Sequence, residues 1–234
     1  MEKVICALWR DPAQEPDAFN GHLLASLPGK LRGAGASRIR INLRDGAVAP
    51  AAGLVQRWQA PQQDAVLQFW VPSANAIWRS AIDKAIAGHC LRHAAWLVAE
   101  STIIPNTLHP PTSGQRTAGW SQASFISFRP DLSRDAAIRH WHSHHTRVAI
   151  DTQSNFEYVQ NIVACALTAD APPYDAFVEE CFPAEAMTDP AAFFDAAGDP
   201  GKFEANVSAM NQSCAAFIDF SRIDIIPTSQ FDLS

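Results

Sequence analysis

Four of the eight histidines in this 234-residue chain lie within six consecutive positions, residues 140–145. The pKa of an imidazole lies near neutral pH, so the ring can accept or donate a proton under physiological conditions. Imidazole is also a common metal ligand. This segment is therefore the first place in the sequence to look for acid–base catalysis or for a metal site.

Helical geometry separates the four histidines. One stripe of a helix at this position would contain four side chains, Ile138, Trp141, His145 and Val148. His145 would then lie at the centre of the apolar face, with His142 and His144 at its edges and His140 pointing away. Desolvation lowers the pKa of a histidine and keeps it neutral, which suits a general base. The alternative is a core histidine that only hydrogen-bonds a backbone carbonyl.

A metal site is the second chemistry that these histidines permit. His140 with His144, and His142 with His145, have the i,i+4 and i,i+3 spacings that let two side chains share an ion. However, the sequence has no HExxH pattern, and no carboxylate lies on the same turns. We therefore predict no metal at this segment.

The elements that must position this segment form a repeat. A polar stretch rich in proline and glycine, residues 105–119, has the composition of a linker. Each flank opens with an apolar strand that ends in an arginine and a turn, at residues 10–12 and 129–131. Each flank closes with Ile-Ile-Pro, at 103–105 and 225–227. We therefore predict an N-terminal half at 1–104 and a C-terminal half at 120–234.

Both halves are predicted to run strand, helix, strand, strand, helix, strand. After the opening strand, the first half has a helix at 16–34, strands at 37–44 and 64–71, a helix after Ser73 and a strand at 94–104. The second half has a helix from an N-cap at Ser133 to about 150, strands at 155–168 and 176–182, helical segments at 185–218 and a strand at 220–227. This order predicts an α+β fold of two tandem ferredoxin-like βαββαβ halves. We expect them to pack sheet to sheet as an intramolecular, pseudo-dimeric α/β barrel.

Strand 37–44 carries polar residues on one face. Ile39, Ile41 and Leu43 alternate with Arg38, Arg40, Asn42 and Arg44. If the sheets close into a barrel, Arg40 and Asn42 line its interior, where they favour an anionic ligand or pair with a carboxylate. The alternative is a row of arginines that faces water.

The second half resembles a known family. Phe128-Arg129-Pro130-Asp131-Leu132-Ser133, then Arg139-His140-Trp141 and His145-Thr146, are similar to the signature helix of the EthD family in the dimeric α/β-barrel superfamily. Tyr158-Val159-Gln160-Asn161 and the strand at 175–182, with its acidic pair, agree with the same family. The resemblance covers about 120–230. Cys181 departs from it, because relatives often have an aromatic residue after the acid. The first half has Phe19-Asn20-Gly21-His22 but lacks the Trp-three-residues-His spacing, so we expect it to be a degenerate copy.

The resemblance implies a cavity near the signature histidine and a choice of chemistries. We expect first a cofactor-independent lyase, cyclase or isomerase that acts on an aromatic or polyketide-like molecule. In it His145 would be the general base, Tyr158 or Asn161 would bind the enolate oxygen, and Glu179 would orient the imidazole. The predicted ligand-binding residues are Trp141, His144, Asn161, Phe177, Arg40, Asn42 and Trp70. Since adjacent strand residues face opposite ways, only one of Glu179 and Glu180 can face the cavity. Either glutamate could instead form a structural ion pair with Arg38, Arg40 or Arg129.

Two other classes of function stay open. One is an oxidoreductase or its accessory protein in ether or aromatic degradation, with a histidine as the ligand of a haem iron. The other is a non-catalytic binding or stress-related barrel in which the histidine is structural.

Composition limits the partners. The formal net charge of −6 makes a nucleic-acid partner unfavourable, and no apolar run approaches the ~20 residues of a membrane-spanning helix. The five cysteines are scattered and odd in number, which is typical of reduced thiols in the cytoplasm. We expect a small aromatic or anionic ligand, and exposed sheet edges leave open a homodimer of the pseudo-dimer.

Overall fold

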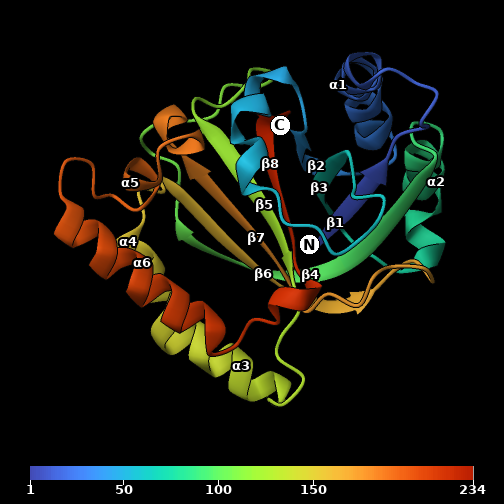
Figure 1. Ribbon diagram of the computed structural model, residues 1–234. Coiled ribbons are helices and arrows are strands. Elements are labelled where there is room, and N and C mark those ends of the chain that lie inside the picture. The colour runs from blue at the N-terminus through green and yellow to red at the C-terminus, as the bar shows by residue number, and fades with distance from the viewer. Residues whose placement is uncertain (234) are drawn as a thin grey trace.

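The computed structural model describes residues 1–233, in which eight antiparallel strands close into a barrel (Figure 1). Around the barrel the order is β1 (Glu2–Trp9), β3 (Ala65–Val71), β2 (Ser37–Leu43), β8 (Asp224–Asp232), β5 (Trp120–Ile126), β7 (Ala176–Phe182), β6 (Glu157–Ala166) and β4 (Arg92–Ile104). Each half contributes four neighbouring strands. Pairing of β2 with β8 and of β4 with β6 joins the halves, which confirms the predicted α+β barrel.

The helices cover the outside of the barrel in two groups (Figure 1). The first group is α1 (Pro16–Gly33) and α2 (Ala76–Ala87), and the second is α3 (Arg134–His140), α4 (Thr146–Thr152), α5 (Pro190–Phe193) and α6 (Pro200–Ala215). A π-helical turn at Trp141–His145 connects α3 to α4. Short 3₁₀ helices lie at Gly46–Leu54, Ala184–Met187 and Phe220–Arg222. No helix of residues 1–233 combines the length and the apolar character that crossing a membrane requires.

Most predicted boundaries agree with the structure to within a few residues. Ser133 caps α3 as expected, because its hydroxyl accepts a hydrogen bond from the backbone N–H of Ala136 at 3.2 Å. The last strand is displaced from the predicted 220–227 to 224–232. Asp219 explains the shift, since its carboxylate caps the 3₁₀ helix that occupies the start of the predicted strand.

The two helical layers differ in how they meet the sheet. In the first half, α1 packs Phe19, Leu23, Leu27 and Leu31 against the strands, and Ile82 and Ile86 of α2 join the same apolar cluster. All six side chains are buried. These residues form one continuous apolar cluster between the helices and the sheet. In the second half, the equivalent space contains a cavity.

Strand alternation decides which side chains reach that cavity. On β7, Phe177 and Glu179 point into the barrel, where Phe177 packs with Trp96 and Phe125. Val178 and Glu180 point out towards the helices of the second half. Consecutive glutamates therefore enter two separate environments.

Candidate active site

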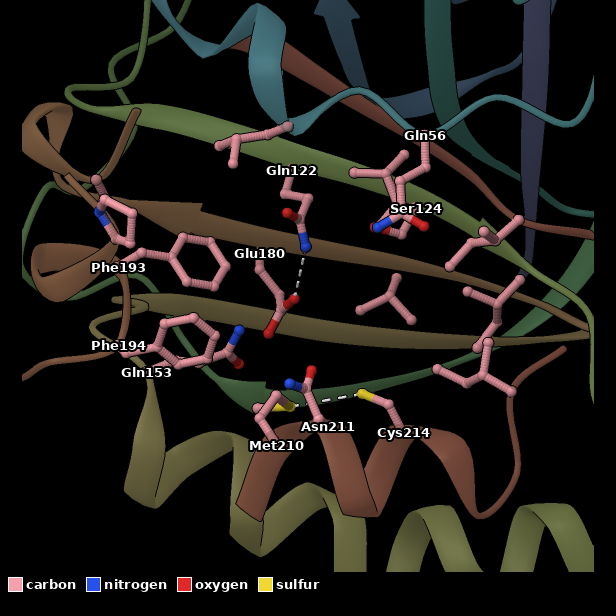
Figure 2. Close-up of a pocket in the computed structure, with 18 of the residues that line it drawn as sticks. Gln56, Gln122, Ser124, Gln153, Glu180, Phe193, Phe194, Met210, Asn211 and Cys214 are labelled. Atoms are coloured by element: carbon pink, nitrogen blue, oxygen red, sulfur yellow. Dashed lines mark hydrogen bonds between the residues drawn. The ribbon is translucent and has the colours of Figure 1, made fainter. Parts of the chain in front are cut away.

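A cavity of about 670 Å³ lies between the outer face of the second-half sheet and the helices (Figure 2). Its floor comes from β5, β6 and β7, one wall from α6, and another from the segments at 50–56 and 186–194. Most of the lining is apolar or aromatic, including Phe193, Phe194 and Met210. The volume lies within the range of sites that bind small molecules. We take this cavity as the candidate active site.

Glu180 is the carboxylate of this cavity. Its side chain projects from β7 into the centre of the pocket in Figure 2. One carboxylate oxygen accepts a hydrogen bond from Asn155 Nδ2 at 2.9 Å, and the other accepts one from Gln122 Nε2 at 3.4 Å. Burial raises the pKa of Glu180 to about 7, although these two hydrogen bonds lower it. No cation pairs with this carboxylate among residues 1–233.

Tyr158 lies directly opposite Glu180 in the β6–β7 ladder and shares its face of the sheet. Side chains so paired have Cβ atoms about 4.5–5.5 Å apart. The Tyr158 hydroxyl oxygen accepts hydrogen bonds from Trp141 Nε1 at 3.2 Å and from Gln160 Nε2 at 2.7 Å. Burial raises the pKa of Tyr158, and the nearby Glu180 charge adds to the effect. The phenol therefore stays protonated, and its two acceptor positions are occupied.

The π-helical turn carries Trp141 and His145, whose rings both pack against Phe217. Both side chains are buried and line the cavity. A π turn leaves backbone groups without their usual helical partners, and here Thr146 Oγ1 donates to the Trp141 carbonyl at 2.9 Å. His145 Nδ1 lies 2.9 Å from Ser213 Oγ on α6. Burial, together with the charges of His140 and His144, lowers the pKa of His145 to about 4, so its ring is neutral at pH 7.

The barrel interior holds a second polar cluster, separated from the cavity by the sheet. Arg40 Nη1 donates to Glu157 at 2.6 Å and to Glu179 at 2.9 Å. Asn42 Nδ2 donates to Glu179 at 2.6 Å, and Gln68 Nε2 donates to it at 2.8 Å. Burial alone would raise the pKa of Glu179, but the Arg40 charge and these hydrogen bonds hold it below its ordinary value. Arg40 thus pairs with carboxylates, one of the two outcomes expected from the sequence.

The structure therefore divides the predicted site residues between the two faces. Trp141, His145 and Tyr158 meet in the cavity. The prediction that Glu179 orients the imidazole of His145 is wrong, because Glu179 points into the barrel and His145 contacts Ser213 instead.

Other predicted ligand-binding residues also lie away from the cavity. Asn161 is buried inside the barrel, where its Nδ2 donates to the Phe177 carbonyl at 3.3 Å, so it cannot bind an oxyanion beside His145. Phe177 packs in the barrel core, and Trp70 lies at one mouth of the barrel under Lys3 Nζ, 4.7 Å from the ring centroid. His144 is exposed, since the π turn carries it to the solvent side.

Of the acidic pair, Glu180 lines this cavity, whereas the sequence analysis named Glu179 as the catalytic partner of His145. Glu180 belongs to the face that also carries Gln122 and Tyr158, as the registers of β5 and β6 with β7 show. Alternation along 176–182 separates the two glutamates but does not say which face is outer. Pairing with Tyr158 would have identified Glu180, but only if the register had been known.

The cavity does not fit a haem, the cofactor that the oxidoreductase hypothesis allowed. Haem propionates need cations at the rim of a site, and no lysine or arginine within residues 1–233 lines this cavity. The buried Glu180 carboxylate also faces the space that the macrocycle would fill. Among residues 1–233, no group of three or more histidine, cysteine or acidic side chains is arranged to hold a metal ion.

Comparisons with known proteins agree with this architecture. A sequence model of the EthD domain matches residues 129–221. No curated protein sequence matches the chain. Among solved structures, the chain is similar to an anthrone oxidase-like protein, with a TM-score of 0.60 and 9% sequence identity over 100% of this chain and 93% of that chain.

Two further structures show weaker similarity. One is a monooxygenase candidate from Lactobacillus acidophilus NCFM, with a TM-score of 0.49 and 8% identity, and the other is a chlorite dismutase candidate, with a TM-score of 0.48 and 10% identity. Each comparison covers 100% of this chain and 96% of the other. Residues 129–221 are therefore similar to the EthD domain, and the chain that contains them folds as a closed eight-stranded α/β barrel like that of the anthrone oxidase-like protein.

Proposed function

We propose that this protein is a cofactor-independent enzyme that removes a proton from a carbon next to the carbonyl group of an aromatic small molecule. Glu180 is the general base in this proposal. The observation that carries it is a buried carboxylate without a cation, in a cavity with aromatic and aliphatic walls. The lyase, cyclase and isomerase reactions expected from the sequence can all begin with this step.

The pKa of Glu180 suits the task. A general base works best when its pKa lies close to the working pH, because it is then both ionised and basic. Burial raises the pKa of Glu180 to about 7. By contrast, a pKa of about 4 makes His145 a weaker base than Glu180. We therefore assign the base to Glu180 and keep His145 as a neutral polar group of the wall.

Tyr158 is placed to stabilise the product of proton removal. When the proton moves from carbon to the Glu180 carboxylate, the electron pair of the C–H bond is delocalised onto the carbonyl oxygen as an enolate. Trp141 and Gln160 both donate to the Tyr158 oxygen, so the phenol proton is left to donate to that enolate. Return of the proton from Glu180 to the enolate oxygen gives the enol tautomer, and return to the carbon regenerates the ketone, so neither step needs an oxidant or a cofactor.

Deuterium exchange tests the proposal directly. The purified protein is incubated in D₂O with 2-tetralone, a bicyclic aromatic ketone, and deuterium at the carbon between ring and carbonyl is followed by NMR. We expect exchange above the buffer rate, rising with pH through about 7 as Glu180 ionises.

Two variants decide the assignment. Glu180→Gln keeps the shape of the side chain but removes the base, so the enzymatic exchange should fall by about 100-fold or more. Glu185→Gln, at an exposed position outside the cavity, is the matched control and should leave the rate unchanged. Exchange that survives in Glu180→Gln would refute the role of Glu180.

A further inference from the structure

Ser124 is a polar group of the cavity that the proposed proton transfer does not use. It lies on β5 and lines the cavity, and only 5% of its surface is exposed. Its hydroxyl oxygen has no hydrogen-bond partner among residues 1–233. In Figure 2, Ser124 lies on the side of Glu180 away from Phe193 and Phe194. A buried hydroxyl without a hydrogen-bond partner lowers the stability of the folded protein. The Ser124 hydroxyl lies on a wall that a ligand can reach.

Ser127 is a useful comparison for Ser124, because it is buried but lies outside the cavity. Its hydroxyl is also buried and without a partner, but Ser127 does not line the cavity. The two serines differ in what their hydroxyls can reach. Only the Ser124 hydroxyl can form its missing hydrogen bond with a molecule that enters the cavity.

The registers fix where Ser124 lies relative to Glu180. Gln122 pairs with Glu180 and Ser124 pairs with Val178, so Ser124 and Glu180 are diagonal neighbours on one face of the sheet. Diagonal neighbours in an antiparallel sheet are about 7–8 Å apart. That spacing is comparable to the length of a fused bicyclic ring system, so one such ligand can contact both groups.

The charge of the lining restricts the ligand group that Ser124 can bind. None of the described lysines and arginines lines the cavity, and Glu180 carries a negative charge when ionised. A carboxylate or phosphate on the ligand would find no cation there and would be repelled by Glu180. A hydroxyl or carbonyl group needs only a hydrogen bond.

We propose that Ser124 is a specificity-determining residue that binds a neutral oxygen substituent of a fused-ring aromatic ligand, at the end of the ligand away from the carbon that faces Glu180. This inference rests on the proposed function for the location of the site. It adds that the preferred substrate carries a hydroxyl or carbonyl group besides the carbonyl that activates its C–H bond.

Paired ligands that differ by one oxygen test the inference. Binding of 2-naphthol and of naphthalene is measured by isothermal titration calorimetry with the full chain. We expect the wild type to prefer 2-naphthol, and Ser124→Ala to reduce that preference by roughly three- to tenfold. Ser127→Ala is the matched control, because it removes an equally buried and unpartnered hydroxyl outside the cavity, and it should keep the full preference.

The melting temperature of the free protein is a second, independent measurement. A purely structural role of Ser124 would not combine an unchanged or higher melting temperature with weaker binding of 2-naphthol. Since Ser124→Ala removes an unpartnered hydroxyl, the free protein should melt at the same or a higher temperature while 2-naphthol binds more weakly. An unchanged preference for 2-naphthol in Ser124→Ala would overturn the inference even if the deuterium exchange by Glu180 is observed. Failure of the wild type to bind either compound would overturn it together with the cavity, whereas loss of exchange alone would count only against the proton transfer.

Discussion

Glu179 and Glu180 are consecutive on β7, yet their carboxylates lie on opposite faces of the sheet and have pKa values shifted in opposite directions. Arg40 and the surrounding amides hold the pKa of Glu179 below its ordinary value, although burial opposes them. Burial without a cation raises the pKa of Glu180 to about 7. One carboxylate therefore stabilises the barrel interior, and the other is available for chemistry in the cavity.

The Glu180 carboxylate should cost stability at neutral pH. Its pKa is higher in the folded protein than in the unfolded chain, so its favourable contribution is present at low pH and is lost as pH rises from about 4.5 through about 7. At 1.36 kcal/mol per pKa unit, the loss should reach about 3 kcal/mol. Denaturant unfolding at pH 5 and pH 8 should show this loss in the wild type and not in Glu180→Gln. A loss of the same size in both proteins would contradict the assigned pKa.

The Arg40 guanidinium should be essential to the stability of the polar cluster inside the barrel. Arg40→Met leaves Glu157 and Glu179 buried without their cation, so the free energy of unfolding should fall by roughly 3–5 kcal/mol. The double variant Arg40→Met/Glu179→Gln should recover part of this loss. Arg147→Met breaks the exposed ion pair with Asp151 and should cost less than about 1 kcal/mol. Equal losses at Arg40 and Arg147 would show that burial of the cluster has no energetic consequence.

His145 should make the protein sensitive to acid. Its pKa is lower in the folded protein than in the unfolded chain, so the unfolded chain takes up the proton first, and stability is lost as pH falls from about 6.5 through about 4. The loss should reach about 3 kcal/mol. His145→Gln should have a flatter profile over this window in urea titrations, and the exposed His142→Gln should behave like the wild type. The same pH dependence of stability in both variants would contradict the lowered pKa of His145.

The Tyr158 hydroxyl should stabilise the cavity floor through the groups that donate to it. Tyr158→Phe leaves Trp141 Nε1 buried without an acceptor, whereas Gln160 Nε2 keeps its bond to Thr146 Oγ1 at 2.8 Å. We expect a loss of about 1–3 kcal/mol in thermal or chemical unfolding. Trp141→Phe in the same background should then cost less than it does in the wild type. Simple additivity of the two substitutions would show that this hydrogen bond contributes nothing.

The sequence predicted the elements well because each has a local cause. Alternation marked strand 37–44, and a serine cap marked the start of the helix after Ser133. The repeat of these elements, together with the resemblance of the second half, then led to the barrel. None of these signals depends on which strands are neighbours in space.

The site was harder to predict because it depends on register and on which face of the sheet is covered. Glu179 and Glu180 differ by one position, and only the pairing of Glu180 with Tyr158 and Gln122 assigns it to the cavity. His144 is a second case, because the regular helical stripe placed it at the edge of the apolar face, whereas it lies in a π turn and is exposed. A regular 3.6-residue period does not contain that irregularity.

Closure of the barrel by β8 also constrains how the chain can fold. β8 pairs with β2, for example at Leu43 with Ser229 and at Arg40 with Asp232, so strands far apart in the sequence must meet. Because β8 follows the other seven described strands in the sequence, the edges of β2 and β5 stay open until β8 has been made and docked. Pairing over such a separation is slow, and open edges recruit other strands. The edges of β2 and β5 are therefore the places where a chain that has not yet docked β8 is open to pairing with another chain.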